Sequence, residues 1–153
     1  RYLSGARFLP SSVLRRAISD NQLREGPYGS MWAAHTDDAG DVCGWEERGP
    51  EWRGFSTGGS KYLFRLGARD ASRLCVTEAA IDAMSLAAIE DVREDTLYLS
   101  TGGGWAPATA RRLRAPGSRT ASPTRRWSST WTPSTAPVWM RADSKVCISC
   151  LKP

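Results

Sequence analysis

With 153 residues the chain is long enough to bury a hydrophobic core without disulfide or metal support, and its longest apolar run, residues 83–89, is too short to cross a bilayer. Because no export signal is visible either, these features predict a soluble, cytoplasmic protein with no membrane partner. The net charge of +5 does not indicate a uniformly basic surface, since residues 1–105 carry 12 basic and 15 acidic side chains, whereas residues 106–153 carry 9 and 1.

The first half of the chain is predicted to be small and rich in hairpins. Residues 10–12 precede an apolar stripe at helical spacing, which indicates a helix that ends near residues 20–21. Short apolar segments at residues 31–36 and 42–46 flank a turn, as expected for a β-hairpin, and residues 61–66 form a further strand.

The second half has the alternation of a parallel α/β sheet. A buried strand at residues 74–77 is followed by a helical pattern over residues 79–92, a strand at residues 96–100, a glycine turn and a helix from Pro107 to about residue 115. Open sheets of this kind bind ligands at the carboxyl ends of their strands, which is where Glu78 and Gly102–Gly104 fall.

Four cysteines are present, and none is expected to pair or to bind zinc. Cys43 and Cys75 lie in strand-like apolar segments, as buried free thiols do. Cys147 and Cys150 form a single C-x-x-C, but a structural zinc site needs four ligands and His35 is distant in sequence.

Glu78 and Asp82 are four residues apart at the start of a predicted helix, so both carboxylates lie on one face. Like charges at this spacing repel, and a cation such as Mg²⁺, completed by phosphate oxygens and water, would compensate them. The alternative is an acidic first turn that is stabilised by the helix dipole alone.

The segment from Leu74 to Leu86 resembles the first motif of Toprim domains, in which a strand ends in Glu and the next helix carries Asp one turn later. The resemblance implies metal-dependent phosphodiester chemistry on DNA or RNA. Glu78 would be the catalytic general acid/base and a metal ligand, Asp82 a supporting ligand, and Mg²⁺ or Mn²⁺ the cofactor. Ala79 departs from the usual primase form, where glycine commonly follows the Glu.

Upstream residues carry a second resemblance. The turn Asp38-Ala39-Gly40, Arg48 and the pair Lys61-Tyr62 resemble the segment that precedes Toprim in primases. More closely, residues 2–104 resemble a domain of unknown function found in front of Toprim in plasmid and mobile-element proteins, including relaxase and primase types. By this resemblance Arg48 and Lys61 bind phosphate of a nucleic acid or nucleotide; the alternative is a solvated hairpin rim.

Three other features have competing interpretations. Gly102 and Gly103 precede a helix and would let phosphate approach the backbone closely. The tryptophans could stack bases, but strand alternation favours packing for most of them, with Trp32 and Trp45 on faces that a small core needs. His35 has no plausible triad and is interpreted as structural. The tryptophans considered are Trp32, Trp45, Trp52 and Trp105.

The second acidic motif of Toprim chemistry, D-x-D, is absent from the sequence, because residues 116–153 contain one acid, Asp143. We interpret this tail as translated out of frame. Trp is always TGG and Thr always ACN, so reading from the third codon base turns Trp131-Thr132 into Asp. The junction Ser129-Thr130 becomes NAC, which includes Asp, so the displaced frame can restore the motif.

The sequence therefore predicts an α/β protein: a truncated, Toprim-like parallel sheet (residues 71–115) preceded by a small α+β hairpin-rich segment (residues 1–70) and followed by an irregular basic tail (residues 116–153). The expected function is primase-like phosphoryl transfer in the intact ancestor, with this copy inactive or severely impaired. The alternatives are a non-catalytic nucleic-acid-binding module and a Toprim nuclease or topoisomerase. Because the sheet lacks a strand, we expect marginal stability, with Ile81 and Ile89 partly exposed.

Overall fold

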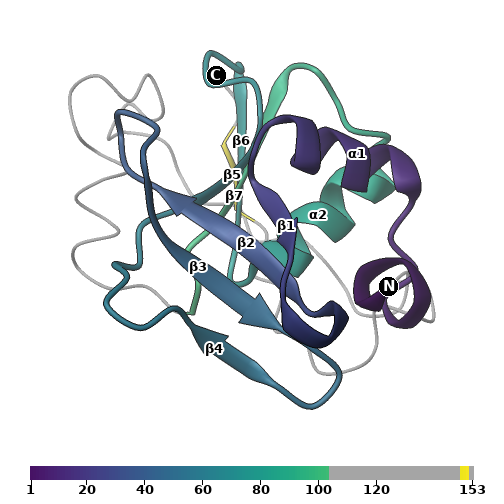
Figure 1. Ribbon diagram of the computed structural model, residues 1–153. Helices are drawn as coiled ribbons and strands as arrows, with labels where there is room; N and C mark the ends of the chain where they lie inside the picture. The colour runs from purple at the N-terminus through teal and green to yellow at the C-terminus, as the bar shows by residue number, and fades with distance from the viewer. Residues whose placement is uncertain (104–148, 152–153) are drawn as a thin grey trace.

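The computed structural model describes residues 1–103 and 149–151, and its strands form two four-stranded sheets (Figure 1). The general expectation of mixed α/β structure is confirmed. The helix predicted from Pro107 and most of the basic tail, with its proposed frameshift, lie outside the described residues, as do Trp105 and Cys147. In the part of the chain that is described, no helix is long and apolar enough to cross a membrane.

The first sheet is antiparallel, with the order β1-β2-β3-β4. It follows a π-helical turn (η1) and the predicted first helix, α1, and the expected hairpin is formed by β2 and β3. Asp37 closes this hairpin, because its side chain accepts hydrogen bonds from the amides of Gly40 and Asp41. The elements are η1 (Tyr2–Ala6), α1 (Ser11–Ser19), β1 (Leu23–Glu25), the 3₁₀ turn η2 (Pro27–Gly29), β2 (Met31–Thr36), β3 (Val42–Arg48) and β4 (Arg53–Phe55).

The second sheet has the order β5-β7-β6-β8 and is mixed, which corrects the expectation of a parallel sheet. Only β6 and β7 run parallel, because the helix α2 connects them; β5 and β8 pair antiparallel with β7 and β6, respectively. The residues are β5 (Phe64–Gly67), β6 (Arg73–Thr77), α2 (Ala80–Ile89), β7 (Thr96–Ser100) and β8 (Ser149–Leu151). Thus three residues of the tail form a strand on the open edge of β6.

Strand β5 connects the two halves of the fold. The sequence groups residues 61–66 with the hairpins, but β5 belongs to the second sheet, with Phe64 and Leu66 buried in the core. On its opposite face, the Arg65 guanidinium binds the carbonyl and hydroxyl oxygens of Thr36 at the end of β2, and it lies 3.1 Å from Asp38. An isolated bridge between Thr36 and Leu63 makes the same connection in the backbone.

Among the described residues, the larger of two hydrophobic clusters spans both sheets, and the smaller one gathers Leu63, Leu74, Val76, Leu97 and Leu99. Helix α2 is apolar almost all round, as a buried helix must be, and it packs against α1, β6 and β7 (Figure 1). Ile81 is only 9% exposed, so the expectation that it is partly uncovered is wrong, whereas Ile89 is 47% exposed, as expected. The core includes Val13 and Ala17 of α1, Met31 and Ala33 of β2, Phe64 and Leu66 of β5, Ala83, Met84 and Ala87 of α2, Cys75 of β6 and Tyr98 of β7.

The tryptophans of the first sheet do not lie in this core. Trp32 and Trp45 are half-buried, and the alternation of β2 places Trp32 on the face opposite the core residues Met31 and Ala33. The two indole rings are 6.2 Å apart, and the Arg24 guanidinium lies 4.9 Å from the Trp45 ring. Trp32 and Trp45 therefore pack, as expected, but against each other on the outer face of the sheet; only the prediction that they face the core is wrong.

Candidate functional site

Glu78 lies in the short turn between β6 and α2, and its side chain is exposed. The turn is fastened to the end of β7, because the Glu78 carbonyl accepts hydrogen bonds from the Gly103 amide (3.0 Å) and the Ser100 hydroxyl (3.1 Å). Both Gly102 and Gly103 have positive φ, 65° and 111°. The carboxylate and the glycine turn therefore share the carboxyl end of the parallel pair, as the sequence predicts.

Asp82 is the third residue of α2, and its Oδ2 accepts a hydrogen bond from the Ala79 amide at 3.3 Å. Burial raises the pKa of Asp82 above its usual value, and the carboxylates of Glu46 and Glu78 add to this rise; the Ala79 amide and Arg48 oppose it. Asp82 is therefore a largely buried carboxylate at the start of α2, with two other carboxylates near enough to affect it.

Glu46, which the sequence analysis did not single out, reaches this turn from β3. Its side chain is 4% exposed, and Oε2 accepts a hydrogen bond from the Ala80 amide at 3.1 Å while Oε1 accepts one from Arg48 Nε at 3.1 Å. Burial acts to raise the pKa of Glu46, but His35, the Ala80 amide and Arg48 together lower it below the usual value. The signal that could have revealed it is a carboxylate at an inward-facing position of a strand.

His35 lies directly behind Glu46 and is fully buried. Its Nε2 is 3.8 Å from Glu46 Oε2, too far for a hydrogen bond, and neither ring nitrogen has a hydrogen-bond partner among the described groups. The Phe55 ring packs edge-on against the His35 ring, with the two ring centroids 5.1 Å apart. On the other side a Cβ added to Gly102 would lie 2.5 Å from His35 Cε1, so the absence of a side chain at Gly102 permits this packing.

The two cations expected to bind phosphate are placed differently. Arg48 is at the site, bonded to Glu46 and partly exposed, so it can also face an incoming anion. The Lys61 ammonium lies 5.6 Å from the ring centroid of Phe55. The structure therefore gathers Glu78, Asp82, Arg48, Gly102 and Gly103 around the start of α2, and it places Lys61 against Phe55.

The acidic side chains near α2 do not by themselves complete the coordination of a metal ion. Within residues 1–103 and 149–151, no cluster of three or more His, Cys, Asp or Glu side chains is arranged to hold a metal ion. Glu78, in the turn before α2, and Asp82, in the first turn of α2, supply two carboxylates. Mg²⁺ commonly binds one or two protein carboxylates and fills its remaining positions with water and substrate phosphate, so these residues fit a cation that is shared with a phosphate.

Comparison with known families bears on the first half of the chain. Residues 1–71 match the family model described as "Protein of unknown function (DUF3991)". This agrees with the expected resemblance to a domain of unknown function. Glu46, His35 and Arg48 lie within the match, whereas Glu78 and Asp82 lie beyond it. A search of curated proteins and a search of solved structures found no match.

Proposed function

We propose that the chain contains the metal-binding half of a Toprim-type nucleic-acid enzyme of primase-like ancestry. Glu78 and Asp82 hold Mg²⁺ or Mn²⁺ against a phosphate of DNA, RNA or a nucleotide. The observation that carries the proposal is the exposed Glu78 carboxylate at the carboxyl end of a parallel strand, beside a glycine turn and one helical turn from Asp82.

In this proposal each residue has a defined part. A divalent cation supplies the positive charge that neutralises a phosphate during displacement at phosphorus. Glu78, which is exposed, binds that cation and accepts or donates a proton at the reacting oxygen. Asp82, in the first turn of α2, would supply a second carboxylate to the cation, and the partly exposed Arg48 would bind the phosphate. The amides of Gly102 and Gly103 are bonded to the Ser100 hydroxyl and the Glu78 carbonyl, so the glycine turn shapes the site without donating to the phosphate.

The proposed activity of this copy is binding without efficient turnover. Two-sided metal chemistry requires a second acidic group, and residues 116–153 contain only Asp143. The frameshift interpretation explains this deficit. Sequencing the encoding DNA tests it: stop codons in the displaced frame between residues 120 and 140, or a codon other than Asp at the Ser129-Thr130 junction, would contradict it.

Mn²⁺ titration of the full chain, followed by paramagnetic broadening of assigned amides, tests the site. We expect weak binding that broadens the amides of residues 78–82 and is lost in Glu78→Gln and Asp82→Asn, because each removes one of two charged ligands. Glu94→Gln is the matched control, since Glu94 is an exposed acid preceding β7, at the opposite end of the strand from the glycine turn. If both site variants retain wild-type Mn²⁺ binding, the metal assignment is wrong.

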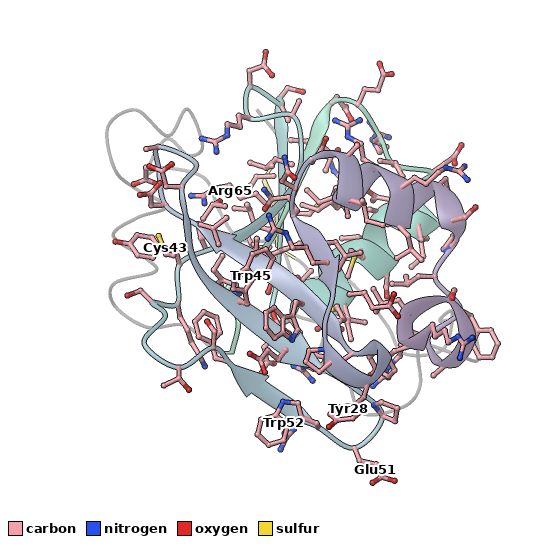
Figure 2. The ribbon with its side chains drawn as sticks, viewed as in Figure 1. Tyr28, Cys43, Trp45, Glu51, Trp52 and Arg65 are labelled. Atoms are coloured by element: carbon pink, nitrogen blue, oxygen red, sulfur yellow. The ribbon has the colours of Figure 1, made fainter. Side chains whose placement is uncertain are left out.

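The outward-facing tryptophans favour a second candidate, a non-catalytic module that binds single-stranded nucleic acid. Figure 2 shows Trp45 over the first sheet and Trp52 near β4, and Trp52 is 62% exposed. Indole rings on a sheet are stacking surfaces for unpaired bases. Oligonucleotide binding that is salt-sensitive, survives Glu78→Gln and is lost on deletion of residues 116–153 would favour this function. Metal-dependent cleavage of a labelled strand without nucleoside triphosphates would instead indicate a Toprim nuclease.

A further inference from the structure

The helix that carries Asp82 begins against a carboxylate from a distant strand. The first amides of an α-helix have no partner within the helix and must be satisfied from outside. The Ala79 amide is bonded locally by Asp82, but the Ala80 amide is bonded by Glu46, which lies 34 residues earlier in the chain. A single side chain of the first sheet therefore anchors the start of α2.

Both the backbone and the side chain of Glu46 are fixed by contacts within the fold. In the backbone, β3 pairs Glu46 with Ala33 of β2 and with Phe55 of β4, so it occupies an interior strand. Its carboxylate is bonded by Arg48 and the Ala80 amide, and the His35 ring closes the space behind it. A carboxylate stays ionised in the interior only where hydrogen bonds and opposite charges compensate its desolvation, so breaking the Glu46–Ala80 hydrogen bond would be costly.

His35 extends this arrangement to the second part of the site. Its ring lies near both the Glu46 carboxylate and Gly102, and the Gly103 amide next to Gly102 is bonded to the Glu78 carbonyl. The acidic turn is thereby held from two directions, through Ala80 at the helix start and through the glycine turn at the end of β7. Both supports originate in residues 35–46, within the segment that matches the family model.

We propose that Glu46 is a positioning residue, which fixes the first turn of α2 and so places Glu78 and Asp82 for their shared cation. This inference rests on the proposed metal site. It also means that the first sheet contributes to the site itself and is not a separate module. We assign Glu46 no ligand role, because its carboxylate is 4% exposed and already pairs with the Ala80 amide and Arg48.

The test compares Glu46→Leu, which cannot accept a hydrogen bond, with Glu46→Gln, which keeps an acceptor for the Ala80 amide. Removing a residue that orients metal ligands typically lowers metal affinity about 10–100-fold. We expect Mn²⁺ affinity of the full chain to fall by about tenfold or more in Glu46→Leu and to recover largely in Glu46→Gln. The Ala80 amide resonance should move in Glu46→Leu and return toward its wild-type position in Glu46→Gln.

Glu90→Leu is the matched control. Glu90 follows the last residue of α2 and is bonded by Arg73 and Tyr98, so its loss disturbs the same helix at the opposite end. It should leave Mn²⁺ affinity unchanged at a temperature at which all variants are folded. A purely structural role for Glu46 would instead give equal losses in Glu90→Leu and Glu46→Leu, and that result would overturn the proposal.

The two proposals fail separately. If wild-type protein does not bind Mn²⁺, the metal site fails, while the Ala80 resonance still reports whether Glu46 anchors α2. If wild-type protein binds Mn²⁺ but Glu46→Leu binds it equally well, the positioning role is wrong. Should Glu46→Leu not fold, Glu46→Asp replaces it: the shorter side chain withdraws the carboxylate from Ala80, and unchanged Mn²⁺ affinity and an unchanged Ala80 resonance would refute the proposal.

Discussion

Replacement of Gly102 by alanine tests the contact on which the geometry of the site depends. An added Cβ would lie 2.5 Å from Cε1 and 3.0 Å from Nε2 of the fully buried His35 ring, closer than non-bonded atoms allow. The ring cannot move away freely, because Phe55 packs against it at 5.1 Å. Gly102 also has a φ of 65°, which disfavours any residue with a side chain.

The expected cost has two parts. The left-handed backbone costs alanine about 1–2 kcal/mol, and forcing an extra methyl into a packed interior costs about 1–3 kcal/mol more. Gly58→Ala isolates the first part, because Gly58 has a similar φ of 75° and nothing within 4 Å of an added Cβ. We therefore expect Gly102→Ala to destabilise the fold by about 2–5 kcal/mol and Gly58→Ala by about 1–2 kcal/mol.

Urea unfolding of the two variants measures this difference, and a double-mutant cycle assigns it. In a His35→Ala background the steric part should disappear, so Gly102→Ala and Gly58→Ala should then cost about the same, with a coupling energy of at least about 1 kcal/mol between Gly102 and His35. Equal destabilisation by Gly102→Ala and Gly58→Ala in the wild-type background, with no coupling to His35, would refute the contact.

Three further predictions concern stability. The pKa of Glu46 in the folded protein lies below its usual value of 4.5, so its stabilising contribution is present at neutral pH and is lost as the pH falls through the folded-state pKa. In urea unfolding at a series of pH values, Glu46→Gln should therefore lose less stability on acidification than the wild type does. Arg73→Met removes two hydrogen bonds to the partly buried Glu90 and should cost about 1–3 kcal/mol in the same assay; a cost below about 0.5 kcal/mol, as for a surface pair, would contradict this. Ala79→Gly should change the free energy of unfolding by no more than about 0.5 kcal/mol, because Ala79 is the N-cap of α2, where glycine is at least as favourable as alanine. Mn²⁺ affinity should be unchanged; tighter Mn²⁺ binding would show that the methyl group obstructs the site.

Much of the candidate site follows from local sequence patterns. Asp82 lies in the first turn of α2, as the helical spacing predicts, but Glu78 precedes the N-cap Ala79, whose backbone is extended, so the prediction that one helical face carries both carboxylates is wrong. The predicted order of strand, helix and strand also produces the parallel pair of β6 and β7, since a helical connection returns the chain in the same direction. Alternation likewise predicts the β2–β3 hairpin, although it does not say which face will be buried.

The sequence by itself thus determined the periodic elements and the residues that a short turn brings together, because these depend on interactions over a few residues. Only the tertiary structure decided that β5 joins the second sheet, that Glu46 binds the Ala80 amide and that His35 packs on Gly102. These contacts join segments tens of residues apart, and their identity depends on which buried polar groups and apolar faces can be satisfied at the same time. Local periodicity contains no information about that choice.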